Sequence, residues 1–359
     1  MLTAMVLAVS CSDRDAGRMA SVSRIPVWSE DTCRYIDNKD KTDFWGKYSE
    51  ASLFREKYIL VKTAESNPKF GYAGRDGKFI IAPVYKQATV FSQGLAWVVK
   101  RGEAPSVINK KGELKFTLRE AHHVRQFCEG LAAYSVHSGN GFLWGFVNTS
   151  GETVIAPAFQ RVEDFSFGRA AVMNGDGKWG YIDRQGELVI DCRYDEARSF
   201  HRENRAIVGV NGLYGVIDAK GDGVVATEYT AMRPDGKWLL VERNKKWGWC
   251  SEAGETVIDP RFEQASCFYG ASLAPVRIGQ KWAYINRKGK VKIKRQFDRA
   301  LPFVGKLAAV WAGNRIGFID EKGHYVINPQ YDKISDDYIS NAQDGVSCYS
   351  RVVTDRPHR

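Results

Sequence analysis

The chain has 359 residues, and 52 Lys and Arg against 42 Asp and Glu give it a formal net charge of +10 at pH 7. It contains no run of 18 or more apolar residues, which excludes an internal transmembrane helix. Its seven cysteines form no Cys-x-x-Cys pair and no Cys/His spacing typical of a zinc site. We therefore expect packed free thiols, no metal site and no cofactor.

The N-terminal residues 1–23 are predicted to be a truncated lipoprotein signal and tether, and residues 24–359 a single repeat array. The apolar run from Leu2 to Val9 precedes Ser10-Cys11. This resembles the end of a bacterial lipoprotein signal, which implies lipidation at Cys11 and a place in the cell envelope, in the periplasm or on the outer surface. Residues 1–10 contain no Lys or Arg, so a cytoplasmic chain with an unstructured N-terminus is the alternative.

A tryptophan–glycine unit recurs along the chain with fixed internal spacing. In the clearest copy Trp179-Gly180 is followed by Gly186 at +7 and Tyr194 at +15. The same frame recurs, with an aliphatic first residue in the last copy, at Phe70/Gly77/Tyr85, Trp144/Gly151/Phe159, Tyr214/Gly221/Tyr229, Trp247/Gly254/Phe262, Trp282/Gly289/Phe297 and Ile316/Gly323/Tyr331. A fixed period of this kind is typical of a repeat protein.

Each unit is expected to be a meander of three or four short strands. In the copy at 178–212, alternating residues from Trp179 predict a strand, and Asp183 to Gly186 predicts a type I turn. A return strand follows, then the aromatic at +15 and a Phe six residues later, Phe200. We expect the Gly of Trp-Gly to admit a neighbouring ring or backbone where a Cβ would clash.

Nine copies can be counted, which include two degenerate copies at 33–62 and 105–139 and an atypical last copy from 316. Eroded ends are what an open array needs as caps. We therefore favour an all-β open solenoid or superhelix of about nine units of ~35 residues. A propeller-like toroid is the alternative. It is less favoured because propellers typically close with four to eight blades, and nine units are counted here.

These residues resemble the WG-repeat family of bacterial proteins, over roughly residues 33–345. The resemblance implies an all-β repeat protein, often secreted or lipid-anchored, with a role in interaction. The family supplies no catalytic residues, and none are assigned here.

A basic segment at 277–299 holds nine Lys and Arg and one acidic residue. Alternation in 290–294 predicts one lysine-lined strand face, with Val291 and Ile293 pointing inward. The candidate ligand-binding residues are Lys288, Lys290, Lys292, Lys294 and Arg295. Such a row protects an edge strand from pairing, or it binds a polyanion such as an acidic glycan, anionic lipid or nucleic acid.

Two other motifs are assigned structural roles. Residues 175–180 match the pattern GxGxxG, but they lie in a predicted hairpin and open no helix, as a dinucleotide-binding loop must. His122 and His123 have no Cys or acidic residue at metal-ligand spacing, so we expect surface or partly packed histidines.

The sequence therefore predicts a non-enzymatic, monomeric binding or scaffolding protein that presents a repeat surface to a protein partner. A binder of polyanionic or cell-surface glycan, through the basic strand face, is the alternative. A hydrolase-type enzyme that uses the His122/His123 region is a more distant one. No specific nucleic acid is predicted as partner, and the membrane is reached only through the lipid at Cys11.

Overall fold

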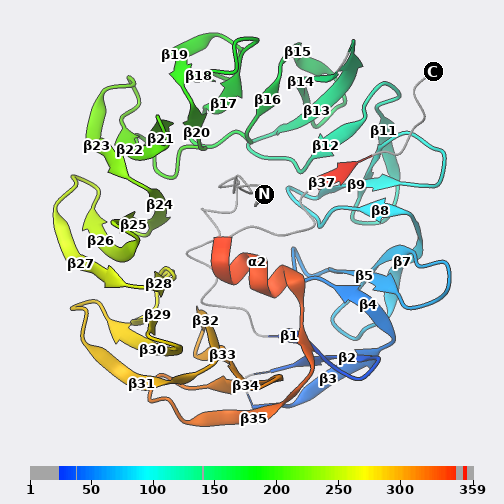
Figure 1. Cartoon of the computed structure of the whole chain (residues 1–359). Helices are drawn as coiled ribbons and strands as arrows, with labels where there is room; N and C mark the ends of the chain where they lie inside the picture. The colour runs from blue at the N-terminus through cyan, green and yellow to red at the C-terminus, as the bar shows by residue number, and fades with distance from the viewer. Residues whose placement is uncertain (1–23, 38, 140, 345–350, 354–359) are drawn as a thin grey trace.

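A computed structural model describes residues 24–37, 39–139, 141–344 and 351–353. The described strands form nine antiparallel sheets that stand side by side in a ring, as Figure 1 shows. In seven of these sheets the chain runs from the strand nearest the ring centre to the strand at the circumference, and two sheets add an inner strand from near the C-terminus. The fold is thus a nine-bladed β-propeller, and we number the blades 1 to 9 from the one that contains the first strand.

Blades 1 to 3 contain the N-terminal strands and one strand from near the C-terminus. Blade 1 has, from the centre outward, β36 (Lys333–Ile334), β1 (Ile25–Ser29), β2 (Thr32–Ile36) and β3 (Thr42–Gly46). Blade 2 has β4 (Tyr48–Ala51), β5 (Ile59–Thr63), β6 (Phe70–Ala73) and β7 (Phe79–Tyr85). Blade 3 has β8 (Gln87–Ala88), β9 (Leu95–Val99), β10 (Ser106–Asn109) and β11 (Leu114–Thr117).

Blades 5 and 6, and the first four strands of blade 4, follow one another in sequence. Blade 4 has β12 (His123–Arg125), β13 (Leu131–Ser138), β14 (Gly141–Asn148) and β15 (Thr153–Phe159). Blade 5 has β16 (Arg161–Val162), β17 (Ala170–Met173), β18 (Trp179–Ile182) and β19 (Leu188–Tyr194). Blade 6 has β20 (Glu196–Ala197), β21 (Ala206–Val210), β22 (Leu213–Ile217) and β23 (Gly223–Tyr229).

Blades 7 to 9 complete the ring. Blade 7 has β24 (Ala231–Asp235), β25 (Trp238–Arg243), β26 (Lys246–Ser251) and β27 (Thr256–Phe262). Blade 8 has β28 (Gln264–Ala265), β29 (Leu273–Ile278), β30 (Lys281–Asn286) and β31 (Val291–Phe297). Blade 9 has β32 (Arg299–Val304), β33 (Leu307–Ala312), β34 (Arg315–Ile319) and β35 (Tyr325–Tyr331).

Two further elements lie inside the ring in Figure 1. Helix α2 (Asp336–Asp344) follows β36 directly and lies on the inner side of the ring, beside blades 9, 1 and 2. Strand β37 (Arg351–Val353) pairs antiparallel with β12, which makes blade 4 five-stranded. No helix in the described part of the chain is long and apolar enough to cross a membrane.

The prediction of an open solenoid is wrong, because the two ends of the array build one blade. The repeat frame begins at the third strand of a blade, so the residues after the last Tyr, Tyr331, continue into the innermost strand of the next blade. That blade is blade 1, where Val27 and Trp28 of β1 pair with Ile334 and Lys333 of β36. The eroded first and last copies are therefore not caps but complementary parts of a single sheet.

The glycine of each Trp-Gly unit is required by a bulge in the outermost strand. In blade 5 Trp179 pairs with Tyr194 and Tyr181 with Ile190, so the outer strand carries extra residues between the two pairs. A Cβ added at Gly180 would lie 2.4 Å from the carbonyl oxygen of Ile190. The expected close approach of backbone at this glycine is confirmed, and the bulge lets the outer strand bend around the blade.

The predicted turns are also confirmed. The amide of Gly186 donates to the Asp183 carbonyl at 3.1 Å, and Asp183 Oδ1 accepts from the amides of Gln185 and Glu187, both at 2.9 Å. Gly186 has φ of 90°, a conformation that costs little without a side chain. These hydrogen bonds hold the third and outermost strands in register.

The core consists of separate clusters that lie between consecutive blades. One cluster contains Tyr181 and Tyr194 of blade 5 with Phe200 and Val208 of blade 6. Another joins both ends of the chain, since it contains Ile25 and Val27 of blade 1, Phe318 of blade 9 and Tyr338 of α2. Because each blade buries its aromatic side chains against the neighbouring blade, the aromatic residues of the frame stabilise the packing of one blade on the next.

Candidate functional site

Four joints between consecutive blades contain a tyrosine hydroxyl that crosses the gap. The Tyr two residues after the Trp position donates to the backbone carbonyl 17 residues further on, in or just after the next blade's innermost strand. The pairs are Tyr35 to Ser52 at 2.8 Å, Tyr72 to Thr89 at 2.7 Å, Tyr181 to Arg198 at 2.8 Å and Tyr284 to Leu301 at 2.9 Å. The hydroxyl thereby satisfies a carbonyl just past the paired residues or, for Leu301, at an irregularity of the strand.

Blade 7 replaces this contact with a buried carboxylate. Trp249 occupies the Tyr position, and Asp235 occupies the position of the frame's later Phe. The Asp235 carboxylate accepts from Trp249 Nε1 at 2.8 Å and from the amides of Phe268 and Tyr269 of blade 8 at 2.8 and 2.9 Å. Burial raises the pKa of Asp235, and these donors oppose that shift.

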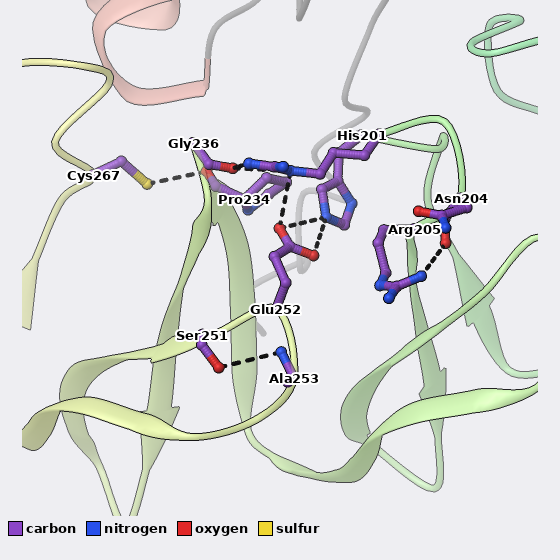
Figure 2. Close-up of polar contacts among 10 residues, drawn as sticks. His201, Asn204, Arg205, Pro234, Gly236, Ser251, Glu252, Ala253 and Cys267 are labelled. Atoms are coloured by element: carbon purple, nitrogen blue, oxygen red, sulfur yellow. Dashed lines mark hydrogen bonds and ion pairs between the residues drawn. The ribbon is translucent and has the colours of Figure 1, made fainter.

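A second polar contact lies on the face that carries the Asp183-type turns. There the loop after each innermost strand approaches the turn of the following blade. His201 and Arg202 belong to such a loop in blade 6, and Glu252 to the turn of blade 7 (Figure 2). We call these three residues the blade 6–7 cluster.

In the blade 6–7 cluster, His201 Nε2 lies 3.2 and 3.3 Å from the two carboxylate oxygens of Glu252. Arg202 Nε is 3.5 Å from Glu252 Oε1, and its guanidinium also donates to the Gly236 carbonyl. The His201 side chain is buried, and its Nδ1 has no hydrogen-bond partner among the described residues. The arrangement orients the imidazole with Nε2 as donor to the carboxylate.

The same position makes an inter-blade contact elsewhere in the ring. Lys110, in the turn of blade 3, forms an ion pair of 2.9 Å with Glu56 of blade 2. Glu321, in the turn of blade 9, accepts from Ser272 of blade 8. The described residues include no group of three or more His, Cys, Asp or Glu that could hold a metal ion. The blade 6–7 cluster is thus a three-residue version of an inter-blade contact that two residues make in the other two places.

A buried ion group joins blades 4 and 5. Arg125 lies 2.6 Å from Asp164 through Nε and 2.9 Å from Glu163 through Nη2, and it donates to the Val162 carbonyl at 2.9 Å. All three charged side chains are almost completely buried. The two carboxylates hold the pKa of Arg125 above its usual range, although burial opposes this. This group fixes the position of one blade relative to the next.

The predicted basic residues lie together on the circumference of blade 8. Lys292, Lys294 and Arg295 belong to β31, and Lys288 and Lys290 to the turn that precedes it; all five are exposed. Ile293 points into the core as predicted, but Val291 does not, because 47% of its surface is exposed. The register of β30 and β31 shifts between the pairs Ile285–Val291 and Tyr284–Ile293, which breaks the simple alternation at Val291. The five predicted cations therefore lie together on the surface, but of the two residues predicted to point inward only Ile293 does so.

The predicted histidine pair lies on the innermost strand of blade 4 and just before it. His123 Nδ1 and the Ser135 hydroxyl are 2.7 Å apart, and the ring lies 5.7 Å from Trp144 and 4.5 Å from Phe142 between centroids. His122 lies 5.4 Å from the Phe142 ring. Burial lowers the pKa of His123, and the neighbouring His122 lowers it further. The prediction of partly packed histidines is confirmed.

Five cysteines lie in the described residues, and all are free thiols: Cys33, Cys128, Cys192, Cys250 and Cys267. Burial raises the pKa of Cys250 to about 11, so its thiol stays protonated. This confirms the prediction of packed thiols for these positions. Cys11, the predicted lipidation site, lies outside the described residues.

The blade 6–7 cluster and the Arg125 group were not predicted from the sequence. Arg125, Glu163, Arg198 and Arg233 occupy one repeat position, where Ser52, Thr89 and Ser266 stand in other blades. A charged residue at a position that several other blades fill with Ser or Thr was the available signal. The partners are 38 or more residues apart, so the closing of one blade on the next must be known before they can be paired.

The fold and these joints define a closed β-propeller built from tandem repeats. The sequence profile of the WG containing repeat matches residues 70–103, 144–179, 179–214, 247–282, 282–310 and 316–341. The chain belongs to the family of proteins built from this repeat, as its residues indicated. No curated protein matches the sequence.

Among the solved structures that resemble this chain, one supports the fold. A structure described as that of the eukaryotic initiation factor is 11% identical, with a TM-score of 0.64 over 88% of this chain and 98% of its own. The computationally designed Ika8 protein is 13% identical with a TM-score of 0.44, over 77% and 97%. BamB from Moraxella catarrhalis is 10% identical with a TM-score of 0.42, over 76% and 91%. At such identities only the first likeness bears on this chain, and it concerns the fold alone. A propeller built of repeats is consistent with a binding scaffold.

Proposed function

We propose that this chain is a non-enzymatic, monomeric scaffold that binds a protein partner along its circumference. The observation that carries the proposal is a row of exposed aliphatic side chains at the second position of the outermost strands. The exposed fraction of the residue surface is between 37% and 52% at Ile80, Val154, Val189, Val257 and Val326. Exposed apolar surface on a regular, rigid frame is a common property of protein-binding surfaces.

Folding alone does not explain this row. β-branched residues stabilise strands, so the row would be explained by folding if the outer strand needed such a residue at this position. In blade 8, however, Lys292 stands at the same position, and β31 pairs with β30 in the register found in blades 5 and 7. The outer strand therefore forms without an apolar residue there, which supports a contact with another molecule as the reason for the row.

Site-specific photo-crosslinking tests the proposal. A photoreactive phenylalanine is placed at Val189 or Val326 on the circumference, and at Arg184 or Lys220 on the turn face as controls, since all four positions are solvent-accessible. The expected result is the same discrete protein adduct from both circumference positions and none from the controls. Equal adducts at all four positions, or none on the circumference, would contradict the proposal. Substrate turnover that His123→Ala abolishes would contradict its non-enzymatic part.

We also propose that the chain acts in the cell envelope, held there by lipid on Cys11. The support is the sequence at 2–12, which lies outside the described residues. Metabolic labelling with a palmitate analogue and mass measurement of the N-terminal peptide test this. Label that persists after Cys11→Ser, or an unmodified N-terminus beginning before Cys11, would refute it.

A further inference from the structure

We propose that the exposed edge of blade 8 is a binding site for a linear acidic polysaccharide, that is, one with carboxylate or sulfate groups along its length. The site consists of Lys288, Lys290, Lys292, Lys294 and Arg295, which we call the blade 8 strip. It goes beyond the proposed protein scaffold, because it lies on a different blade from the crosslinking positions and takes a ligand of different chemistry.

Two cations of the blade 8 strip depart from the residue types that most other blades have at the same positions. Lys292 stands where five other outermost strands have Ile80, Val154, Val189, Val257 and Val326, whereas blade 3 has Lys115 there. Arg295 stands where four other outermost strands have a proline, Pro83, Pro157, Pro260 and Pro329. The opposite glycine of Trp-Gly is Ala283 in this blade alone among the six copies with an aromatic at the Trp position. Blade 8 therefore has a local sequence of its own, centred on the strand that carries the charges.

The strip is accessible and its charges are uncompensated. β31 is the outermost strand of its sheet, with β30 on its inner side. Among the described residues, no ion pair involves any of the five cations of the strip. Other basic residues of the segment are engaged: Lys281 pairs with Asp298 at 2.6 Å, and Arg287 lies over the rings of Trp238 and Phe268. The strip is thus a set of cations with no partner in the described chain.

The spacing of the strip suits a linear polyanion. Alternate residues of a strand lie on one face about 6.6 Å apart, so Lys292 and Lys294 have this spacing along β31, and Lys290 lies just before the strand begins. Flexible lysine side chains on a row of this length can reach several anionic groups of an extended chain. An acidic polysaccharide has such groups at regular intervals, and binding releases its condensed counterions.

The aromatic residues of blade 8 favour a polysaccharide over a nucleic acid. Proteins that bind single-stranded nucleic acid stack bases on exposed rings beside the basic groove. Here Tyr284 and Phe297, which flank the strip in β30 and β31, are buried at 0% and 2% exposure. Neither of these two rings is therefore available for stacking a base, and attraction by charge remains.

Charge reversal tests the proposal on the full chain. The triple variant K290E/K292E/K294E is compared with K100E/K111E/K115E, which reverses three exposed lysines of blade 3 and changes the net charge equally. Heparin is the probe, and the dissociation constant is measured over a range of salt concentrations. We expect the blade 8 variant to bind roughly 10- to 100-fold more weakly with a salt dependence about three charges smaller, and the blade 3 variant to bind almost as wild type.

Three outcomes would overturn the proposal. Equal losses in the two variants would mean that heparin responds to net charge alone. Unchanged binding in the blade 8 variant would remove the strip as a site. A single-stranded oligonucleotide of equal charge that binds the wild type more tightly than heparin, and loses that binding in the blade 8 variant, would assign the strip to nucleic acid. Circular dichroism of both variants controls for folding, and the crosslinking positions outside blade 8 keep this test separate from that of the protein scaffold.

Discussion

Blades 1 and 5 have the same four-stranded architecture, but they are assembled in different ways. Blade 5 is continuous from Arg161 to Tyr194, whereas in blade 1 the innermost strand β36 comes from the other end of the chain. In blade 5, neighbouring strands are joined by turns of a few residues. In blade 1, the amide of Glu30 donates to Asp332 across 302 residues of sequence. The ring therefore has one position at which closure depends on non-covalent contacts alone.

Buried polar contacts also hold the segment after β36 against blade 2. Asp337 of α2 accepts from the Leu53 amide of blade 2 at 2.7 Å, and the Ser335 hydroxyl donates to the Ala51 carbonyl. Asp337 and Tyr338 are fully buried. Blade 5 is joined to blade 4 by the Arg125 ion group instead. Variants at the two joints therefore show how much the ring closure and the joint of blades 4 and 5 each contribute to the free energy of unfolding.

The largest effect is expected at the ordinary joint. Arg125→Ala leaves Glu163 and Asp164 buried without their cation, which should lower the free energy of unfolding by about 3–5 kcal/mol. Urea denaturation followed by tryptophan fluorescence measures this. A loss below about 1 kcal/mol would mean that the two acids are hydrated and that the group does not fix the joint.

The closure should be weakened less by its own polar contact. Asp337→Ala leaves the buried Leu53 amide without an acceptor, at a cost of about 1–3 kcal/mol. Glu129→Ala, which removes an acceptor from the part-buried amides of Phe167 and Gly168 at the joint of blades 4 and 5, is the matched comparison. Thermal melts of both variants should show the larger loss for Asp337. A larger loss for Glu129 would contradict the assignment of Asp337 to ring closure.

The blade 6–7 cluster should have a smaller effect. Glu252→Ala removes the partner of His201 Nε2 at a site with partial access to solvent, and we expect a loss of about 1 kcal/mol. Glu252→Gln retains an acceptor and should recover part of that loss. If both variants were as stable as wild type, the cluster would have no role in joining the blades.

The smallest effect separates binding from folding on blade 8. Lys292→Val introduces the residue type found at this position in five other outer strands, so stability should change by no more than about 0.5 kcal/mol. Thermal denaturation checks this expectation. A gain well above that value would mean that the lysine strains the outer strand, and the row at the other blades would then have a folding explanation.

The sequence was sufficient for the elements within a blade and insufficient for their closure. The positions of Trp179, Gly186 and Tyr194 predict the third strand, the turn and the end of the outer strand, because each depends on nearby residues. Whether the units close into a ring or form an open array depends on the packing angle between consecutive blades, and no single residue specifies that angle. The short strand at Lys333–Ile334 has no Trp-Gly signal of its own, so its pairing with β1 could not be inferred from the frame.

The candidate sites show the same division. The strip at Lys290 to Lys294 is visible as an alternation in sequence, since its members are close along the chain. His201 and Glu252 are 51 residues apart and become neighbours only because two blades pack together.

Cross-linking of β1 to β36 tests the closed ring most directly. Val27 and Ile334 are cross-strand partners, so cysteines at these positions fall within the Cα separation that a disulfide needs. After mild oxidation of V27C/I334C, digestion and mass spectrometry should recover a linked peptide pair from folded monomer, and its yield should fall in denaturant. Folded monomer without this linkage would place the two strands apart, as at opposite ends of an open array, and would contradict the nine-bladed ring.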